Sequence, residues 1–265
     1  MRKLSSYEGL SAMVTGASSG IGRLLALRMA QRGARVALVA RRTAELEALA
    51  EEITQAGGDA RSFPCDVAEL AQVEACVAKA QEAFSGIDIL VNNAGYGGHR
   101  SFLEWDLADM DRMMRVNYLG TLYFTKLLLP RMVERRRGWL LFLSSVAGRI
   151  ASPDESAYCA TKFAVLGLAR SLSLEVEDQG VHVLTVCPGA IRTPFFSEED
   201  LRRMPPVAQR SMVEPEGLVD EILRALEKGK REITYPRWIA PAYIVQALAP
   251  GFMRRQLRRT TLDAR

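Results

Sequence analysis

A tyrosine and a lysine four residues apart, Tyr158 and Lys162, form the pair in this sequence best suited to move a proton. Both lie near the start of a predicted helix, where residues four apart share a face and can converge on one bound molecule. A neighbouring ammonium favours the phenolate and lowers the pKa of a tyrosine from about 10 toward working pH. We therefore predict that Tyr158 protonates the alkoxide formed when a carbonyl is reduced, and accepts that proton in the oxidation.

A glycine-rich segment, TGASSGIG at positions 15–22, lies between a predicted strand and a predicted helix. Glycines let the backbone approach a pyrophosphate, and the start of a helix presents free amide N–H groups. A glycine triplet alone would fit a tight strand-to-helix corner about equally well. In this context the segment is predicted to bind the phosphates of a dinucleotide. The residues assigned to that role are Gly16, Ser18, Ser19, Gly20, Ile21 and Gly22.

Two arginines, Arg41 and Arg42, follow the second predicted strand. In dinucleotide-binding folds an acidic residue usually stands there and accepts hydrogen bonds from the adenosine ribose. Here no carboxylate repels a 2′-phosphate, and a guanidinium can bind that phosphate through two hydrogen bonds. The pair therefore favours NADP(H) over NAD(H). The alternative is that both arginines only solvate the start of the following helix.

The spacing T-G-x-x-x-G-I-G resembles the fingerprint of the short-chain dehydrogenase/reductase family. The resemblance implies partners for Tyr158. Ser145, thirteen residues earlier, matches the serine that hydrogen-bonds the substrate oxygen; Ser144 competes by chemistry, but the spacing favours Ser145. Asn117 resembles the helix asparagine that holds a water near the lysine and completes a proton relay. Lys162 would also bind the nicotinamide ribose, which makes Tyr158 and Lys162 part of the cofactor site.

Three further segments resemble family motifs that surround the cofactor. One contacts the adenine, one is the N-N-A-G motif, and one is the P-G-x-x-x-T segment that caps the nicotinamide. Singly, each fits a structural role, whereas together, in family order from residue 15 to 193, they indicate one site. The residues are Asp66 and Val67 for the first, Asn93, Ala94 and Gly95 for the second, and Pro188, Gly189, Ile191 and Thr193 for the third.

Apolar runs alternate with helical stretches along most of the chain, which is typical of a parallel sheet with helices on both faces. The expected fold is α/β, a single-domain, Rossmann-like, doubly wound parallel sheet of about seven strands. Strands are predicted at 10–15, 35–40, 60–65, 87–91, 139–144, 181–186 and 231–234, and helices at 20–33, 43–56, 69–84, 106–134, 155–177 and 214–228. The polar segment 192–213 is predicted to be a lid, with a short helix at 198–204.

The composition excludes several classes of protein. The 265 residues are 48% hydrophobic and 25% charged, as in an ordinary globular enzyme. Four cysteines without close paired spacing and two histidines predict neither a metal site nor a disulfide framework. The positive charge gathers at 135–137 and 254–259, without interleaved aromatics, which argues against nucleic-acid binding. With no signal peptide or membrane-spanning run, we expect a cytoplasmic protein.

The C-terminal segment departs from the family. Residues 1–235 are expected to form the catalytic domain, but the T-G-x-x-x-x-V-D-G-G-like ending of many members is missing. Residues 236–265 are an apolar and basic extension instead. This extension could lie on a membrane surface, giving a peripheral membrane contact. Packing on a partner subunit or beside the active site is the slightly favoured alternative.

The substrate and assembly are expected from the same resemblance. Similar tails occur in relatives that act on hydrophobic ketones, including 3-ketodihydrosphingosine reductases and hydroxysteroid dehydrogenases. With Phe195, Phe196 and Met204 in the predicted lid, the tail favours a lipid-like carbonyl substrate. A 3-oxoacyl-type or small-ketone reductase is the alternative within the family. The alternative from another functional class is a noncatalytic dinucleotide-binding scaffold or sensor. Family members commonly pair the helices at 106–134 and 155–177, which implies a homodimer or homotetramer.

Overall fold

A parallel sheet of seven strands forms the centre of the computed structural model, which describes residues 3–261. The strands occur in the order β3-β2-β1-β4-β5-β6-β7, so the chain winds outward in both directions from β1 and β4. This confirms the predicted α/β fold. The strands are β1 (Ser11–Thr15), β2 (Arg35–Ala40), β3 (Asp59–Pro64), β4 (Ile89–Asn92), β5 (Gly138–Leu143), β6 (Val181–Pro188) and β7 (Glu232–Tyr235).

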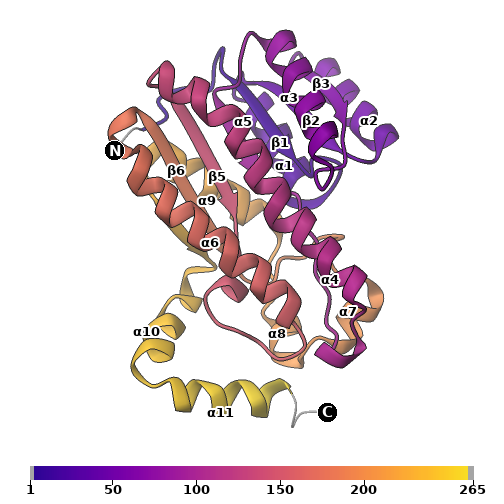
Figure 1. Cartoon of the computed structure of the whole chain (residues 1–265), viewed down its shortest axis with the longest axis vertical. Coiled ribbons are helices and arrows are strands. Elements are labelled where there is room, and N and C mark those ends of the chain that lie inside the picture. The colour runs from indigo at the N-terminus through magenta and orange to yellow at the C-terminus, as the bar shows by residue number, and fades with distance from the viewer. Residues whose placement is uncertain (1–2, 262–265) are drawn as a thin grey trace.

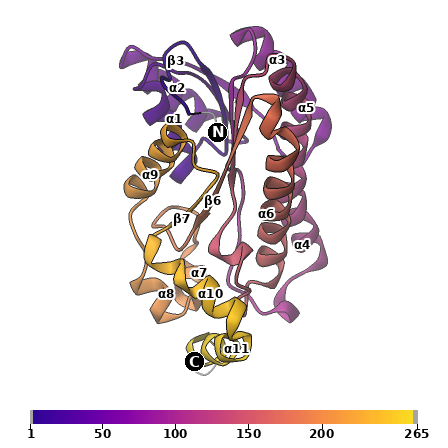
Figure 2. The same cartoon turned by 90° about the vertical axis from the view of Figure 1, so that its left-hand side faces the viewer.

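Helices cover both faces of the sheet (Figures 1 and 2). One face carries α1 (Gly20–Ala30), α2 (Thr43–Gln55) and α9 (Pro215–Lys228), and the other carries α3 (Leu70–Phe84), α5 (Gly120–Glu134) and α6 (Ser156–Val176). Side chains alternate between the two faces of the sheet along each strand. In β1, Val14 therefore packs in the core under α1, α2 and α9, and Met13 packs in the core under α3, α5 and α6. The central strands are buried on both faces, which explains their continuous apolar runs.

The predicted helix at 106–134 consists of three parts. They are α4 (Leu107–Met114), the π-helical turn η2 (Arg115–Leu119) and α5. A π turn inserts an extra residue into the helix and is frequent at functional sites. The side chain of Asn117, within this turn, bonds the backbone of Tyr96 instead of facing solvent. The apolar pattern continues through the turn, so the sequence predicted one uninterrupted helix.

The segment between β6 and α9 contains two short helices. The first, α7 (Glu198–Arg203), was predicted, and the second, α8 (Pro206–Arg210), was not. Pro206 sits at the start of α8, where its missing N–H costs nothing. The segment was therefore more regular than its proline-broken sequence indicated.

The C-terminal extension is helical as far as it is described. It contains α10 (Pro241–Leu248) and α11 (Pro250–Thr261), which lie beyond the lower end of the sheet in Figures 1 and 2. Residues 262–265 of the predicted extension fall outside the described part. No helix among residues 3–261 is both long and apolar enough to span a bilayer. The remaining helical turns are η1 (Phe102–Glu104), η3 (Val146–Gly148), η4 (Glu177–Gln179) and η5 (Arg237–Ile239).

Candidate active site

A cavity of about 740 Å³ opens at the carboxyl ends of the strands. It spans the point between β1 and β4 where the winding direction reverses, the usual ligand site of doubly wound sheets. The structure brings nearly all the predicted site residues to its wall. The exceptions are Gly22 and Asn117, which lie behind the wall and support it.

The glycine-rich turn forms one end of the cavity. Gly16 has a φ of +69°, and a Cβ there would lie 2.8 Å from the Asn93 amide nitrogen. At Gly22 a Cβ would lie 2.4 Å from the Gly16 carbonyl oxygen. Helix α1 begins at Gly20, and its first N–H groups have no partner within the helix. The turn thus brings backbone donors to the cavity, which fits the phosphates of a dinucleotide.

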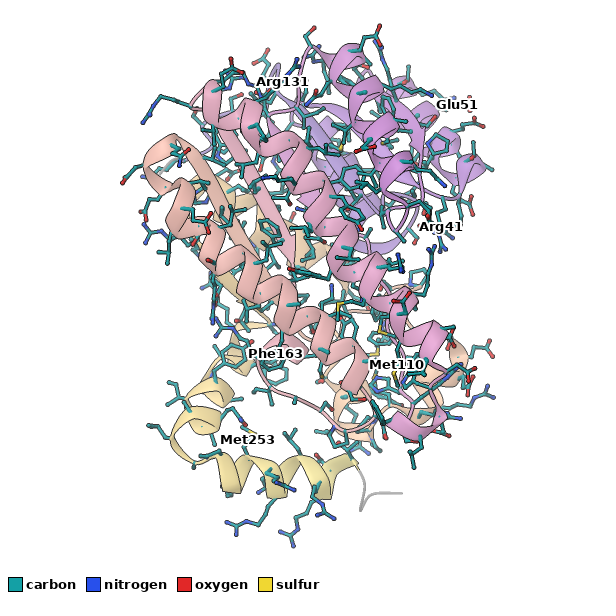
Figure 3. All side chains as sticks on the ribbon, viewed as in Figure 1. Arg41, Glu51, Met110, Arg131, Phe163 and Met253 are labelled. Atoms are coloured by element: carbon teal, nitrogen blue, oxygen red, sulfur yellow. The ribbon has the colours of Figure 1, made fainter. Side chains whose placement is uncertain are left out.

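A basic patch adjoins this turn. Arg42 donates hydrogen bonds to the hydroxyls of Ser18 and Ser19, at 2.9 and 2.8 Å. Arg41 is exposed, projects from the end of β2 and lines the cavity (Figure 3). Two guanidinium groups and two hydroxyls therefore meet where an adenosine 2′-phosphate would lie in such a fold.

Asp66 is the acidic residue at this end of the cavity wall. It forms an ion pair with Arg112. Burial raises the pKa of Asp66, but the hydrogen bond from the Ala68 N–H and the Arg112 guanidinium outweigh it and hold the pKa below its ordinary value. Arg112 forms the ion pair with Asp66, and the Arg41 charge adds to the lowering of the Asp66 pKa from a greater distance.

The loop after β4 is fastened to the end of β1. The Thr15 hydroxyl accepts the N–H groups of Asn93 and Ala94 at 3.0 and 3.1 Å, and the Asn93 side chain donates to the Thr15 carbonyl at 2.8 Å. At Gly95 a Cβ would lie 3.5 Å from the Lys162 Nζ. This loop therefore joins the nucleotide end of the cavity to the tyrosine–lysine end.

Tyr158 and Lys162 lie on the first turns of α6. The Lys162 Nζ donates to the Leu143 carbonyl at 2.8 Å and lies 5.7 Å from the centre of the Tyr158 ring. Ser144 and Ser145 both line the cavity, but the Ser144 hydroxyl donates to the Lys162 carbonyl at 2.9 Å. Since Ser144 is bonded to α6, Ser145 is the serine better placed to meet a substrate.

Burial governs the electrostatics of this pair. It raises the pKa of Tyr158, the Glu155 charge adds to the rise, and a hydrogen bond with Ser145 opposes it. Burial also lowers the pKa of Lys162 to about 8. We expected from the sequence that the ammonium would lower the tyrosine pKa, and this expectation is wrong for the structure described. Desolvation of the phenolate, together with the Glu155 charge, outweighs the hydrogen bond with Ser145.

Asn117 is fully buried, and both the oxygen and the nitrogen of its side-chain amide form hydrogen bonds. Its oxygen accepts the Tyr96 N–H at 3.0 Å, and its nitrogen donates to the Tyr96 carbonyl at 2.8 Å and to the Thr161 hydroxyl at 3.0 Å. It thus ties the loop after β4 to α6, next to Lys162. The sequence did not indicate the contributions of Tyr96 and Thr161, because these contacts depend on the π turn.

The predicted lid covers the tyrosine. The Phe195 ring meets the Tyr158 ring edge-on, with centroids 5.7 Å apart, and Phe196 packs against Phe195 at 5.0 Å. Met204, at the end of α7, is buried and lines the cavity. The three apolar lid residues singled out in the sequence therefore all face the same space.

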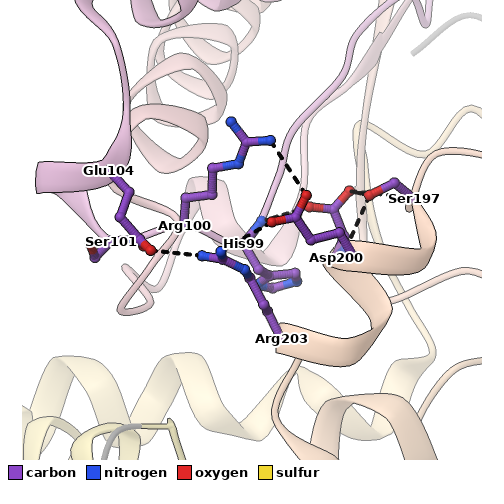
Figure 4. Close-up of polar contacts among 8 residues, drawn as sticks. His99, Arg100, Ser101, Glu104, Ser197, Asp200 and Arg203 are labelled. Atoms are coloured by element: carbon purple, nitrogen blue, oxygen red, sulfur yellow. Dashed lines mark hydrogen bonds and ion pairs between the residues drawn. The ribbon is translucent and has the colours of Figure 1, made fainter.

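Polar contacts fasten the lid to the loop that precedes α4 (Figure 4). An Asp200 carboxylate oxygen accepts the His99 N–H at 3.0 Å. Arg203 pairs with Glu104 at 3.0 Å. Asp200 also accepts from Ser197 in a capping box, so one carboxylate both starts α7 and holds the neighbouring loop.

Several cavity residues were missed by sequence reasoning. His99 and Glu155 line the cavity together with Tyr158, and Ile239, Met253 and Leu257 line it from the C-terminal extension. Figure 3 labels Met253 on α11. Glu155 stands three residues before Tyr158, so helical spacing could have indicated it. Nothing in the sequence brings His99 to this site, because its contact with Asp200 links residues 101 positions apart. Three residues of the extension thus line the cavity, which agrees with the part of the alternative that placed the extension beside the active site.

Comparison with known proteins agrees with this geometry. Residues 11–203 match the family model described as short chain dehydrogenase. "Oxidoreductase UcpA" of Salmonella typhimurium is 37% identical over 84% of this chain and 82% of its own. "3-dehydrosphinganine reductase" of Danio rerio is 34% identical over 92% of this chain and 75% of its own.

A solved structure shares the fold and the family. It is a metagenomic short-chain oxidoreductase in complex with NADP, 31% identical, with a TM-score of 0.74 over 87% of this chain and 97% of the other. The family match covers more than half of the chain, and the relatives align over most of their length. This chain therefore belongs to the short-chain dehydrogenase family and is an oxidoreductase that acts on CH–OH or C=O groups with a nicotinamide dinucleotide.

Proposed function

We propose that the protein reduces a ketone to a secondary alcohol with NADPH, with Tyr158 as the general acid. One observation carries the proposal: Tyr158, Lys162 and Ser145 border the same cavity as the glycine-rich turn. A proton donor and a dinucleotide site thus share one enclosed space. The reaction is reversible, and Tyr158 acts as the base in the oxidation.

A bound nicotinamide supplies the hydride that the carbonyl carbon receives. The hydroxyls of Ser145 and Tyr158 hold the carbonyl oxygen, and Tyr158 transfers its proton to that oxygen as charge develops there. The Lys162 ammonium stabilises the phenolate left behind. Lys162 also binds the nicotinamide ribose, while Asn117 holds a water beside it that returns a proton to Tyr158.

The proposed cofactor is NADP(H) rather than NAD(H). Arg41 and Arg42 bind the 2′-phosphate, supported by the hydroxyls of Ser18 and Ser19. Gly16, Gly20, Ile21 and Gly22 shape the turn that holds the pyrophosphate. Asp66 and Val67 would border the adenine, residues 93–95 would border the centre of the dinucleotide, and the nicotinamide would lie against Pro188, Gly189, Ile191 and Thr193. The solved relative that contains NADP supports this assignment.

The proposed substrate is a ketone with a large apolar part. The substrate end of the cavity is walled by apolar side chains from the lid and from the extension, namely Phe195, Phe196, Met204, Ile239, Met253 and Leu257. The name of the Danio rerio relative, 3-dehydrosphinganine reductase, supports a substrate of this kind. A small polar ketone would leave most of this wall in contact with water.

A panel of ketones tests the substrate class. NADPH consumption is measured with long-chain, polycyclic and small polar ketones. We expect kcat/KM to be at least about tenfold higher for the apolar ketones, because each buried methylene contributes about 0.8 kcal/mol. Equal or better turnover of small polar or 3-oxoacyl substrates contradicts the substrate class but leaves the reaction intact.

The extension is proposed to touch an anionic membrane surface. Ile244, Leu248 and Phe252 are exposed at intervals of four residues across α10 and α11. Four exposed arginines follow them in the chain, and residues 236–261 contain no acidic side chain. An apolar face beside a basic one suits the interface of an anionic bilayer. The arginines are Arg254, Arg255, Arg258 and Arg259.

Vesicle co-sedimentation tests this contact. The Arg254→Glu/Arg255→Glu variant is expected to lose binding to vesicles that contain phosphatidylglycerol, whereas wild type binds them and ignores neutral vesicles. Lys79→Glu/Lys228→Glu, which reverses two exposed charges elsewhere, is the control and should bind like wild type. Equal binding by both variants, or none by wild type, contradicts the membrane contact.

We also propose a homodimer or homotetramer built through α5 and α6. Phe163 and Leu174, both on α6, are exposed apolar side chains. Such side chains suit the buried centre of an interface. Leu174→Asp is expected to lower the mass of the particle measured by analytical ultracentrifugation. A monomeric wild-type protein contradicts the assembly.

A further inference from the structure

An arginine that the proposed mechanism does not use, Arg149, joins three separate parts of the chain. It ends the helical turn η3, which begins directly after Ser145. Its side chain is only 18% exposed and forms an ion pair with one carboxylate oxygen of Glu232 on β7. The other oxygen of Glu232 pairs with Arg170 of α6 at 3.1 Å. Arg149 is therefore held by charge against the edge of the sheet, although it is not part of the cavity wall.

The C-terminal extension packs on the same arginine. The guanidinium carbon of Arg149 lies 4.4 Å from the centre of the Tyr243 ring on α10, which is well within the range of a cation–π interaction. The Tyr243 hydroxyl also accepts a hydrogen bond from the Thr234 hydroxyl of β7 at 3.3 Å. The preceding residue, Ala242, lines the cavity. Helix α10 thus meets the cavity through one residue and Arg149 through the next.

The backbone of Arg149 closes the turn that carries the proposed catalytic serine. The Ser145 hydroxyl accepts the Ala147 N–H at 3.0 Å, and the Ser145 carbonyl accepts the Gly148 N–H at 3.0 Å. The Arg149 N–H donates to the Val146 carbonyl at 2.9 Å. Ser145 and Arg149 are therefore the two ends of one short hydrogen-bonded turn, so a displacement of the arginine also displaces the serine.

We propose that Arg149, held by Glu232 and by the Tyr243 ring, positions the Ser145 hydroxyl for the carbonyl oxygen of the substrate. Arg149 and Tyr243 are positioning residues, because neither lines the cavity. Helix α10 then contributes to the rate of the reaction as well as to the wall. The inference rests on the proposed ketone reduction, in which Ser145 holds the substrate oxygen.

The expected effect is on kcat because the Ser145 hydroxyl acts on the charge that develops in the transition state. A misplacement of about 1 Å in a catalytic group can cost about 100-fold in rate, so a smaller shift of the turn should cost about tenfold. The cofactor site contains neither Arg149 nor Tyr243, and the affinity for NADPH should therefore not change.

Matched substitutions of Tyr243 test the proposal. Tyr243→Leu keeps an apolar side chain but removes the aromatic face, and Tyr243→Phe keeps that face but loses the hydroxyl. We expect kcat with an apolar ketone to fall about tenfold in Tyr243→Leu, with the Kd for NADPH within about twofold of wild type. Tyr243→Phe should retain most of the wild-type kcat. Trp238→Ala, which removes an exposed ring elsewhere in the extension, is the control and should leave kcat unchanged.

Hydrogen exchange measured by mass spectrometry tests the turn itself without any substrate. In Tyr243→Leu the N–H groups of Ala147 and Gly148 should exchange at least about threefold faster than in wild type, because their bonds to Ser145 open more often. Tyr243→Phe should protect them as wild type does. A ring that only anchors the extension would change exchange in α10 and leave the turn as it is.

A second variant, Arg149→Lys, keeps the charge but not the flat guanidinium that stacks on the ring. It should lower kcat to a similar extent, so a misfolded Tyr243→Leu protein cannot conceal the result. Wild-type kcat and wild-type exchange of the turn in folded Tyr243→Leu overturn the inference. An equal loss of kcat in Tyr243→Phe also overturns it, because the bond to Thr234 then matters instead of the ring.

The kinetic constants separate positioning from a passive wall. A rise in the ketone KM with unchanged kcat in Tyr243→Leu overturns the inference, since the extension then only binds the substrate. If wild type binds NADPH but reduces no ketone, the proposed ketone reduction fails, and the inferred role of Arg149 in its rate fails with it. That outcome is recognised from wild type alone, whereas failure of the inference alone appears only in the variants.

Discussion

The Nζ atom of Lys162 lies 5.7 Å from the centre of the Tyr158 ring and is anchored by a hydrogen bond of 2.8 Å to the Leu143 carbonyl. The hydrogen bond to Leu143 therefore fixes the position of the lysine amino group relative to the tyrosine ring. Both side chains are held at the end of β5 and the start of α6, so the fold itself sets their separation. Their surroundings determine how the proposed proton transfer should respond to pH and to substitution.

The rate of reduction should depend on the charge of Lys162. Burial lowers the pKa of Lys162 to about 8, so the free enzyme loses this charge as the pH rises through that value. Tyr158 keeps its proton over the same range, because its pKa is raised. We expect kcat/KM for ketone reduction to be level below about pH 8 and to fall about tenfold per pH unit above it. A profile that stays level to pH 10 contradicts this role of Lys162.

Cofactor choice should depend on Arg41. Arg41→Ala removes a guanidinium from the basic patch, and a hydrogen bond to a charged group contributes about 1.5–3 kcal/mol. The KM for NADPH should rise about tenfold or more, while the KM for NADH stays within about twofold. Arg23→Ala, on α1 but outside the cavity wall, is the control and should change neither. Equal rises in both KM values show that Arg41 does not contact the phosphate.

The contact between Asp200 and His99 should hold the lid closed. Asp200→Ala removes that bond and also the cap of α7. Ser197→Ala removes capping contacts at a cost of about 0.5–2 kcal/mol in helix stability, but leaves the Asp200 to His99 bond. We expect Asp200→Ala to raise the ketone KM several times more than Ser197→Ala does. Equal effects indicate that only the helix cap matters.

The close packing around Gly22 should make the free energy of unfolding sensitive to an added Cβ at this position. Gly22→Ala introduces a Cβ about 2.4 Å from a backbone oxygen, and overpacking of this kind costs roughly 1–3 kcal/mol. At Gly167, in the middle of α6, an added Cβ has no atom within 4 Å, so Gly167→Ala should stabilise by about 1 kcal/mol. Denaturant unfolding of both variants measures the difference. A stable Gly22→Ala protein contradicts the tight turn.

Much of the fold could be predicted because each strand and helix carries its own pattern. The apolar runs and the glycine stops predicted seven strands in a doubly wound order, and Tyr158, Lys162 and the glycine-rich turn were indicated by their spacing. The π turn around Asn117 was not predicted, since the apolar pattern of the helix continues through it and the Tyr96 that Asn117 contacts lies outside the helix. The raised pKa of Tyr158 was missed for a similar reason, because burial is a property of the folded chain.

The site also contains residues that sequence spacing could not assemble. His99 and Asp200 meet only because the loop after β4 and the lid cross the same end of the sheet. Met253 reaches the cavity only because α11 folds back beneath it. Such contacts depend on loop paths, which local patterns do not specify. They concern the substrate end of the cavity, which explains why the chemistry was easier to predict than the substrate.

Removal of the Tyr158 hydroxyl is the sharpest test of the proposed proton transfer. Tyr158→Phe removes the proposed acid and keeps the ring that packs against Phe195. NADPH consumption with an apolar ketone and NADPH binding by fluorescence are measured on wild type and variant. We predict that kcat falls at least about 100-fold, in the range typical of a lost general acid, while the Kd for NADPH changes less than about threefold. Turnover within a few fold of wild type, or a wild type that binds NADPH and reduces no ketone, would contradict the proposed ketone reduction with Tyr158 as the acid.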